Sequence, residues 1–135
     1  KELSMKLNSL LGIGLLATSL NLFANTVEQA QQLYAQRGAD ANNALKASAI
    51  YEELAGKEGD KVVRARLLTG ASESRYFFGT KQSKVERIQE EHQKGMDLAT
   101  AAGELLEKKF GEAFDGSAKT DLARAYYFYA ANLGK

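Results

Sequence analysis

The chain contains no cysteine, no proline and no tryptophan, and only one histidine among its 135 residues. Without cysteine it has no disulfide, no thiol nucleophile and no iron–sulfur cluster, so its stability must come from packing alone. The single histidine, His92, excludes catalytic and zinc sites that need two histidines. No pair of a nucleophile and a base is visible, and adjacent glutamates diverge by about 100° on a helix. We therefore expect a non-enzymatic protein with no cofactor and no metal site.

Residues 1–24 are typical of a secretory signal peptide. A lysine precedes the apolar run of residues 10–17, and polar residues interrupt the segment before Ala24. A membrane-spanning helix needs about 20 apolar residues, so this segment is too short to span a bilayer. We expect cleavage after Ala24, with residues 1–4 upstream of the start at Met5, and we expect residues 25–135 to form one domain. The alternative is a buried N-terminal helix of the mature fold, which Gly12 and Gly14 disfavour.

The signal peptide predicts a periplasmic location. No cysteine follows it, so we expect no lipid anchor and no stable attachment to the membrane. Basic and acidic residues balance once residues 1–24 are removed, and a balanced chain lacks the basic patch that binds nucleic acid. The expected partner is therefore a protein, either a second protein or another copy of the chain, with a small-molecule ligand as the alternative.

Residue preferences favour helix throughout residues 25–135. Valine occurs at only four positions and proline at none, whereas alanine, leucine, glutamate and lysine are abundant. We predict five helices and no sheet. The first starts at Thr26, with a capping box to Gln29, and stops at Gly38; the second runs from Asn42 or Asn43 to Gly56; the third is capped by Asp60 and stops at Gly79. The fourth opens with a capping box, Ser83 to Glu86, and runs to about Phe110, and the fifth runs from about Ser117 to Leu133.

Helical spacing also predicts which side chains face the core. The inward positions of the third helix are Val63, Leu67, Gly70, Ala71, Ser74 and Phe78. Those of the fourth are Val85, Ile88, His92, Gly95, Ala99, Ala102 and Leu106. Those of the fifth are Ala118, Leu122, Ala125, Tyr129 and Leu133. We interpret His92 as a buried structural residue because it lies on this stripe, and the small residues beside it allow a partner helix to approach closely.

Two segments of the chain are similar to each other. ARLLTGASESRYFFG (residues 65–79) and LARAYYFYAANLG (residues 122–134) both combine alanine, arginine, an aromatic cluster and a terminal glycine. Small residues early and bulky residues late are typical of the first helix of a tetratricopeptide (TPR) pair. The pattern predicts an all-α fold of antiparallel helix pairs, a TPR-like α-solenoid with about five helices after the signal peptide.

Three segments in order resemble one known family. They are ALKASAIYEELAGKEGDKVVRARLLTGASESRYFFGT (residues 44–80), QKGMDLATAAGELL (93–106) and ARAYYFYAANLGK (123–135). Together they resemble the tetratricopeptide-like family of the TRAP transporter T component, the periplasmic TatT-like proteins. The resemblance implies a repeat-built, all-helical periplasmic protein that works beside the solute-binding protein of a tripartite transporter. Members of this family usually continue into further helix, so the resemblance implies that this chain is either cut off at Lys135 or an unusually short member.

Arginines stand beside aromatic residues in the third and fifth predicted helices. This combination suits a carboxylate-bearing ligand or a peptide segment, through bidentate hydrogen bonds and stacking. The competing interpretation is ion pairing with acids such as Glu73 and Asp121, together with an aromatic core. The candidate binding residues are Arg66, Arg75, Tyr76, Phe77, Arg124, Tyr126, Tyr127 and Phe128.

The aromatic run at the end of the fifth helix cannot face one core. Tyr129 falls on the inward stripe, whereas Tyr127 and Phe128 have no predicted partner within the chain. We interpret the run as a helix that a further element, a second copy or a ligand covers. The sequence thus predicts an exported TPR-like module for protein binding or assembly. The alternative is a periplasmic carrier of a small apolar or carboxylate-bearing molecule.

Overall fold

The computed structural model describes residues 24–135, so the predicted signal peptide, apart from Ala24, lies outside the described residues. The described part of the chain folds into five α-helices: α2 (Val27–Ala35), α3 (Asn42–Lys57), α4 (Lys61–Thr80), α5 (Val85–Leu106) and α6 (Lys119–Leu133). The prediction of an all-α fold is confirmed. No helix among these residues is long and apolar enough to cross a membrane.

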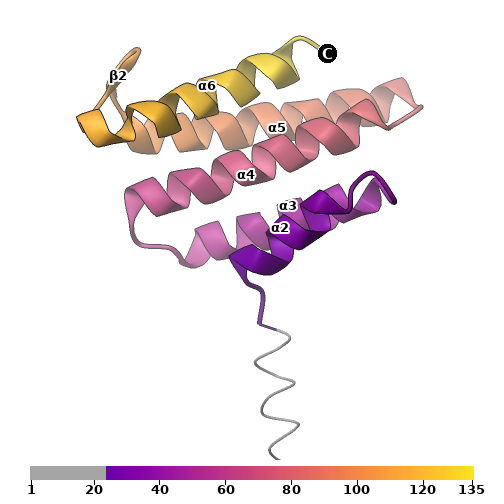
Figure 1. Ribbon diagram of the computed structural model, residues 1–135. Helices are drawn as coiled ribbons and strands as arrows, with labels where there is room; N and C mark the ends of the chain where they lie inside the picture. Colours follow the sequence, from indigo (N-terminus) through magenta and orange to yellow (C-terminus); the bar gives the residue numbers. More distant parts are fainter. Residues whose placement is uncertain (1–23) are drawn as a thin grey trace, which may run out of the picture.

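Consecutive helices run in opposite directions, and together they form two layers (Figure 1). In that view α2, α4 and α6 lie in front, while α3 and α5 lie behind them. Helix α4 occupies the centre, because it packs against α3, α5 and α6. The short connections force this antiparallel order, as helices joined by a few residues must fold back on their neighbours.

Local capping sets three of the helix starts. Thr26 and Gln29 form the predicted capping box at the start of α2, and Asp60 accepts from the backbone N–H of Val63 at 2.9 Å at the start of α4. The capping box predicted at Ser83 is wrong. Helix α5 begins after Lys84, whose extended backbone takes the N-cap position without a side-chain hydrogen bond. The 3₁₀ turn Gly116–Ala118, capped by Asp115, leads into α6.

The prediction that the fourth helix reaches Phe110 without any sheet is also wrong. Helix α5 ends at Leu106, and the chain turns into a small antiparallel hairpin of β1 (Glu107–Lys109) and β2 (Glu112–Ala113). Gly111 makes the turn with φ of 75°, a backbone conformation that glycine adopts without strain. The backbone N–H of Phe114 closes the hairpin by donating to the carbonyl of Leu106 at 2.8 Å.

The core is built mainly from small side chains between α4, α5 and α6. Its buried members are Ala65, Ala102, Leu106, Ala118, Leu122 and Ala125. Five of these six were predicted as inward positions of the fourth and fifth helices, and those assignments are confirmed. Four predicted inward residues are instead exposed, by 38% at Val63, 62% at Val85, 38% at Tyr129 and 60% at Leu133.

A buried polar network explains the difference in α6. Asn132 is 1% exposed; its Oδ1 lies 3.0 Å from Nδ1 of His92, and its Nδ2 donates to the Phe128 carbonyl at 2.8 Å. The same Nδ2 lies 3.3 Å from the hydroxyl of Ser72. Because these partners bind Asn132 inside, the buried stripe of α6 continues after Ala125 through Phe128 and Asn132, each one residue before the predicted Tyr129 and Leu133.

The network also fixes the hydrogen positions on His92. The Nδ2 group of Asn132 faces a carbonyl oxygen, so Oδ1 is the acceptor and Nδ1 of His92 carries the hydrogen. The hydroxyl of Ser72 extends this hydrogen-bond network to α5 by donating to the carbonyl of Gly95 at 2.7 Å. His92 is 3% exposed, as its place on the helical stripe predicts, and it serves to hold α5 against α6.

Candidate functional site

The front layer of helices carries an open groove of about 600 Å³ between α2, α4 and α6, with one residue from α3. We call it the arginine groove. Its lining residues are Val27, Gln31, Tyr34, Ala35, Arg37, Tyr51, Val63, Arg66, Leu67, Gly70, Glu73, Asp121 and Arg124.

Two of the predicted binding residues, Arg66 and Arg124, lie in this groove as partners of carboxylates. The guanidinium of Arg66 donates from Nε and one terminal nitrogen to the two oxygens of Asp121, at 2.8 and 3.1 Å. Arg124 pairs with Glu73. These are the two acids of the competing interpretation, so both arginines join α4 to α6 within the free molecule. The hydrogen bonds that Arg66 donates to the Asp121 carboxylate raise the pKa of Arg66.

A third arginine of the groove, Arg37, has no carboxylate partner among residues 24–135. Its guanidinium carbon lies 4.1 Å from the centre of the Tyr34 ring and 5.1 Å from that of Phe77. One terminal nitrogen donates to the Tyr34 carbonyl at 2.9 Å, while Nε is buried without a partner. The stacking and the backbone hydrogen bond therefore orient a positive charge that nothing in the described chain neutralises.

Two tyrosines stand beside these charges. Burial, followed by the nearby Glu73 carboxylate, raises the pKa of Tyr34 to about 12. The same two causes raise the pKa of Tyr51. Both phenols therefore keep their hydrogen at neutral pH and act as hydrogen-bond donors. With three arginines against two carboxylates, the lining carries one net positive charge and suits an anionic group.

The remaining predicted residues lie elsewhere, and most of them have structural roles. Arg75 is partly buried between α3, α4 and α5, where it pairs with Glu91 at 2.8 Å and Glu52 at 3.2 Å. Tyr76 packs edge-on against His92, with ring centres 5.8 Å apart. Neither side chain lines the groove, so the predicted grouping with Arg66 is not formed.

The predicted aromatic residues also differ in role: some pack within the fold, and others are exposed or line a pocket. Phe77 packs edge-on against Tyr34, with ring centres 6.5 Å apart, and so supports the groove from outside its lining. Phe128 is only 9% exposed, which corrects the prediction that it lacks a partner within the chain. Tyr127 is 66% exposed, and its ring contacts the edge of Phe128. Tyr126 belongs to a second pocket.

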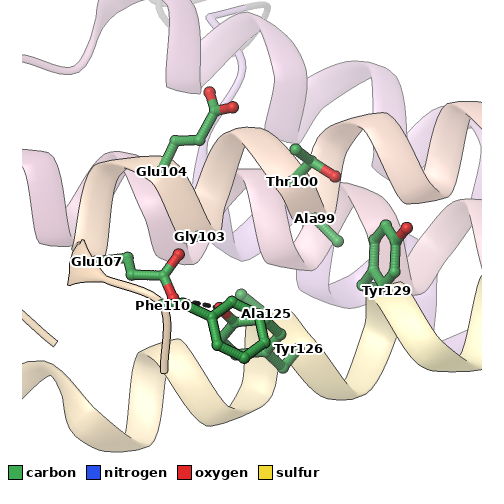
Figure 2. Close-up of a pocket in the computed structure, with 9 residues that line it drawn as sticks. All are labelled: Ala99, Thr100, Gly103, Glu104, Glu107, Phe110, Ala125, Tyr126 and Tyr129. Atoms are coloured by element: carbon green, nitrogen blue, oxygen red, sulfur yellow. Dashed lines mark hydrogen bonds between the residues drawn. The ribbon is translucent and has the colours of Figure 1, made fainter. Parts of the chain in front are cut away.

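That second pocket holds about 360 Å³ between α5, α6 and the hairpin. Figure 2 shows Glu107 beside the rings of Phe110 and Tyr126, Tyr129 on the other side of these rings, and Glu104 pointing away from them. We call it the hairpin pocket. Its lining residues are Ala99, Thr100, Gly103, Glu104, Glu107, Phe110, Ala125, Tyr126 and Tyr129. The Tyr126 hydroxyl donates to Glu107. This hydrogen bond is the largest cause that raises the pKa of Tyr126, and burial is the second.

Sequence reasoning missed the residues that distinguish each pocket. Arg37 follows the first helix without an aromatic run beside it, so its stacking on Tyr34 and Phe77 depends on α2 packing against α4. The signal available in the sequence was the spacing of three between Tyr34 and Arg37, which places both on one helical face. Among residues 24–135, no cluster of histidine, aspartate and glutamate has the geometry to hold a metal ion.

Comparison with known proteins identifies no relative: no protein-family model, no curated protein and no solved structure matches the chain.

Proposed function

We propose that the chain is an exported, TPR-like binding module that holds an acidic peptide segment of a partner protein in the arginine groove. The single observation that carries the proposal is Arg37, a cation oriented by two aromatic rings and left without a counter-ion among residues 24–135. A peptide carboxylate would supply that counter-ion through charge-assisted hydrogen bonds. Tyr51, protonated at neutral pH, adds a donor for a backbone carbonyl of the same peptide, whereas the Tyr34 hydroxyl is bonded to Glu73.

The form of the groove favours a peptide over a small enclosed ligand. It is open along α2, α4 and α6, the helices of one layer, as is expected of the inner face of stacked helix pairs (Figure 1). A carrier requires a closed cavity that covers most of its ligand. The resemblance to the TRAP transporter T component supports the same proposal, with a periplasmic solute-binding protein as the partner.

The experiment selects binders from a displayed library of random peptides with free C-terminal carboxylates, using the purified protein as bait. Affinities of the enriched peptides are then measured by fluorescence anisotropy for the wild type and for Arg37→Gln. Loss of a charge-assisted hydrogen bond of about 1.5–3 kcal/mol weakens binding by about tenfold to a hundredfold. Arg37→Lys keeps the charge without the planar fork, so we expect an intermediate affinity.

The matched control is Arg64→Gln. Arg64 is exposed on α4, outside the groove lining, and its side chain has no partner among residues 24–135. We expect this variant to bind the selected peptides with wild-type affinity. The proposal is wrong if the library yields no acidic peptide, or if Arg37→Gln and Arg64→Gln bind equally well while circular dichroism shows both folded.

A further inference from the structure

The hairpin pocket is a second hollow, and its charge is opposite to that of the arginine groove. It lies where α5 and α6 separate next to the hairpin, and Phe110 of the hairpin turn closes one side (Figure 2). Its volume of about 360 Å³ lies at the small end of the range for ligand pockets. No residue of the groove lining belongs to the pocket lining, so the two sites are independent.

A missing side chain keeps the pocket open. A Cβ built on Gly103 meets no heavy atom within 4 Å, although Gly103 lies inside α5 and is partly buried. Glycine inside a helix is unfavourable relative to alanine, and no close approach of another segment requires it at this position. The space above Gly103 is therefore available to a ligand.

The polar groups of the pocket are acidic. Glu104 has no ion pair and no hydrogen bond with any residue between 24 and 135, and it is exposed at the rim. Glu107 uses one oxygen, Oε1, to accept from Tyr126 and from the backbone N–H of Gly111, while Oε2 has no partner in the described chain. No basic residue lines the pocket. Lys109 of the hairpin is not in the lining, and it pairs with Glu112 at 2.9 Å.

Aromatic rings complete the lining. Phe110 is 92% exposed, which is unusual for phenylalanine, and its ring lies 6.1 Å from that of Tyr126 in an edge-on arrangement. Tyr129 contributes a third ring from the next turn of α6. Ring faces attract cations that have shed part of their hydration, and alkylated ammonium groups shed it most easily.

We infer that the hairpin pocket binds a small organic cation, an alkylated ammonium whose charge faces Glu107, with Glu104 at the rim, and whose apolar groups contact Phe110, Tyr126 and Tyr129. The carboxylates select the charge, the rings select the alkyl groups, and Gly103 provides the room. A carboxylate-bearing ligand, which the sequence favoured for the aromatic residues as a group, is excluded from this pocket by repulsion from the two glutamates.

Nuclear magnetic resonance titration of the ¹⁵N-labelled protein with choline tests the inference. The control ligand is 3,3-dimethylbutan-1-ol, which has the shape of choline without its charge. We expect choline to shift the amide signals of Gly103, Tyr126 and Tyr129 and to bind at least about tenfold more tightly than the neutral alcohol. Equal affinities for the two ligands, or no shift of these signals at about 10 mM choline, would overturn the inference.

Variants locate the site. Gly103→Leu fills the open space and is expected to abolish the shifts, whereas Gly103→Ala leaves most of the space and is expected to bind choline with little change. Glu104→Gln removes a carboxylate that has no partner, and with Glu107→Gln added the affinity is expected to fall at least about tenfold. Unchanged affinity in the folded double variant, checked by circular dichroism, overturns the role of the carboxylates.

The same cation can occur free or as a lipid headgroup, and vesicles of phosphatidylcholine distinguish the two sources. Choline binding without sedimentation of the protein with the vesicles assigns the pocket to a free cation. Co-sedimentation that choline reverses, and that Gly103→Leu abolishes, assigns it to the headgroup. Co-sedimentation that is insensitive to both choline and Gly103→Leu, together with absent choline shifts, refutes binding at this pocket.

Discussion

Replacing Gly95 or Gly103 by alanine is the same chemical change in the same helix, yet we expect opposite effects on stability. Alanine is more favourable than glycine inside a helix by about 1 kcal/mol. At Gly103 the new methyl group meets no heavy atom within 4 Å, so this gain is retained. At Gly95 the methyl group would lie 2.5 Å from Cγ of Asn132, closer than any real contact allows, so Asn132 must move.

The expected loss of stability in Gly95→Ala follows from the hydrogen bonds of Asn132. Its amide is bonded to His92, to Ser72 and to the Phe128 carbonyl, and it is 1% exposed. Each such hydrogen bond contributes about 1 kcal/mol, and a buried polar atom left without a partner costs about 1–3 kcal/mol. After subtraction of the helix preference, Gly95→Ala is expected to lower the free energy of unfolding by about 2–3 kcal/mol, while Gly103→Ala raises it by up to about 1 kcal/mol.

Urea unfolding followed by circular dichroism at 222 nm measures both changes. A double-mutant cycle then isolates the cause, because Asn132→Ala removes the side chain with which the methyl group collides. In that background Gly95→Ala is expected to be neutral or stabilising, close to the effect at Gly103. If Gly95→Ala is as destabilising without Asn132 as with it, or if it stabilises the wild type, the collision is not the reason for the glycine.

Two further predictions concern ionisable groups. Glu91→Gln is expected to lower the free energy of unfolding by about 2–4 kcal/mol, because Glu91 is fully buried and Arg75 would lose its shorter ion pair. In the same urea assay the exposed neighbouring change Glu90→Gln is expected to cost less than about 1 kcal/mol, and equal effects would contradict the reasoning. The second prediction is that stability falls as pH rises from 10 to 12, because Tyr34 ionises near its ordinary pKa of 10.0 when unfolded but near about 12 when folded. The proton bound more tightly in the folded state stabilises it fully below the unfolded pKa of 10.0, so the wild type is expected to lose stability relative to Tyr34→Phe between about pH 10 and 12; parallel curves would exclude this account.

The helical fold could be predicted because its causes are local. Thr26 with Gln29, and Asp60 with the backbone of the next turn, set helix starts through bonds that span three residues. The small stripe of α5 follows from the period of the helix, and Ala99, Ala102 and Leu106 are buried as that period requires. The start of α5 was not predicted correctly. Lys84, with an extended backbone, takes the N-cap position, so the capping box expected at Ser83 does not form.

The candidate binding residues were only partly predictable, because residue type does not specify the partner. Arg66 and Arg124 were expected to bind a ligand or neighbouring acids, and tertiary packing pairs them with Asp121 and Glu73. Arg37 was not selected, since the rings that orient it come partly from α4, 40 residues further along the chain. The paired residues are 55 positions apart for Arg66 and Asp121 and 51 for Arg124 and Glu73, so no local sequence pattern indicates that they form ion pairs.

Composition and spacing by themselves determined five helices, their antiparallel order and the face that α5 buries. These features depend on backbone preferences and contacts within about four residues of each position. Only the tertiary structure decided which residues α6 buries after Ala125, the hairpin after Leu106 and the grouping of charges into two pockets of opposite sign. The buried positions at the end of α6 depend on Asn132 meeting His92 and Ser72, which lie 40 and 60 residues away in the sequence. A buried amide is stable only when its polar atoms have hydrogen-bond partners. The free energy of leaving Asn132 without them is larger than the difference between burying Phe128 and burying Tyr129.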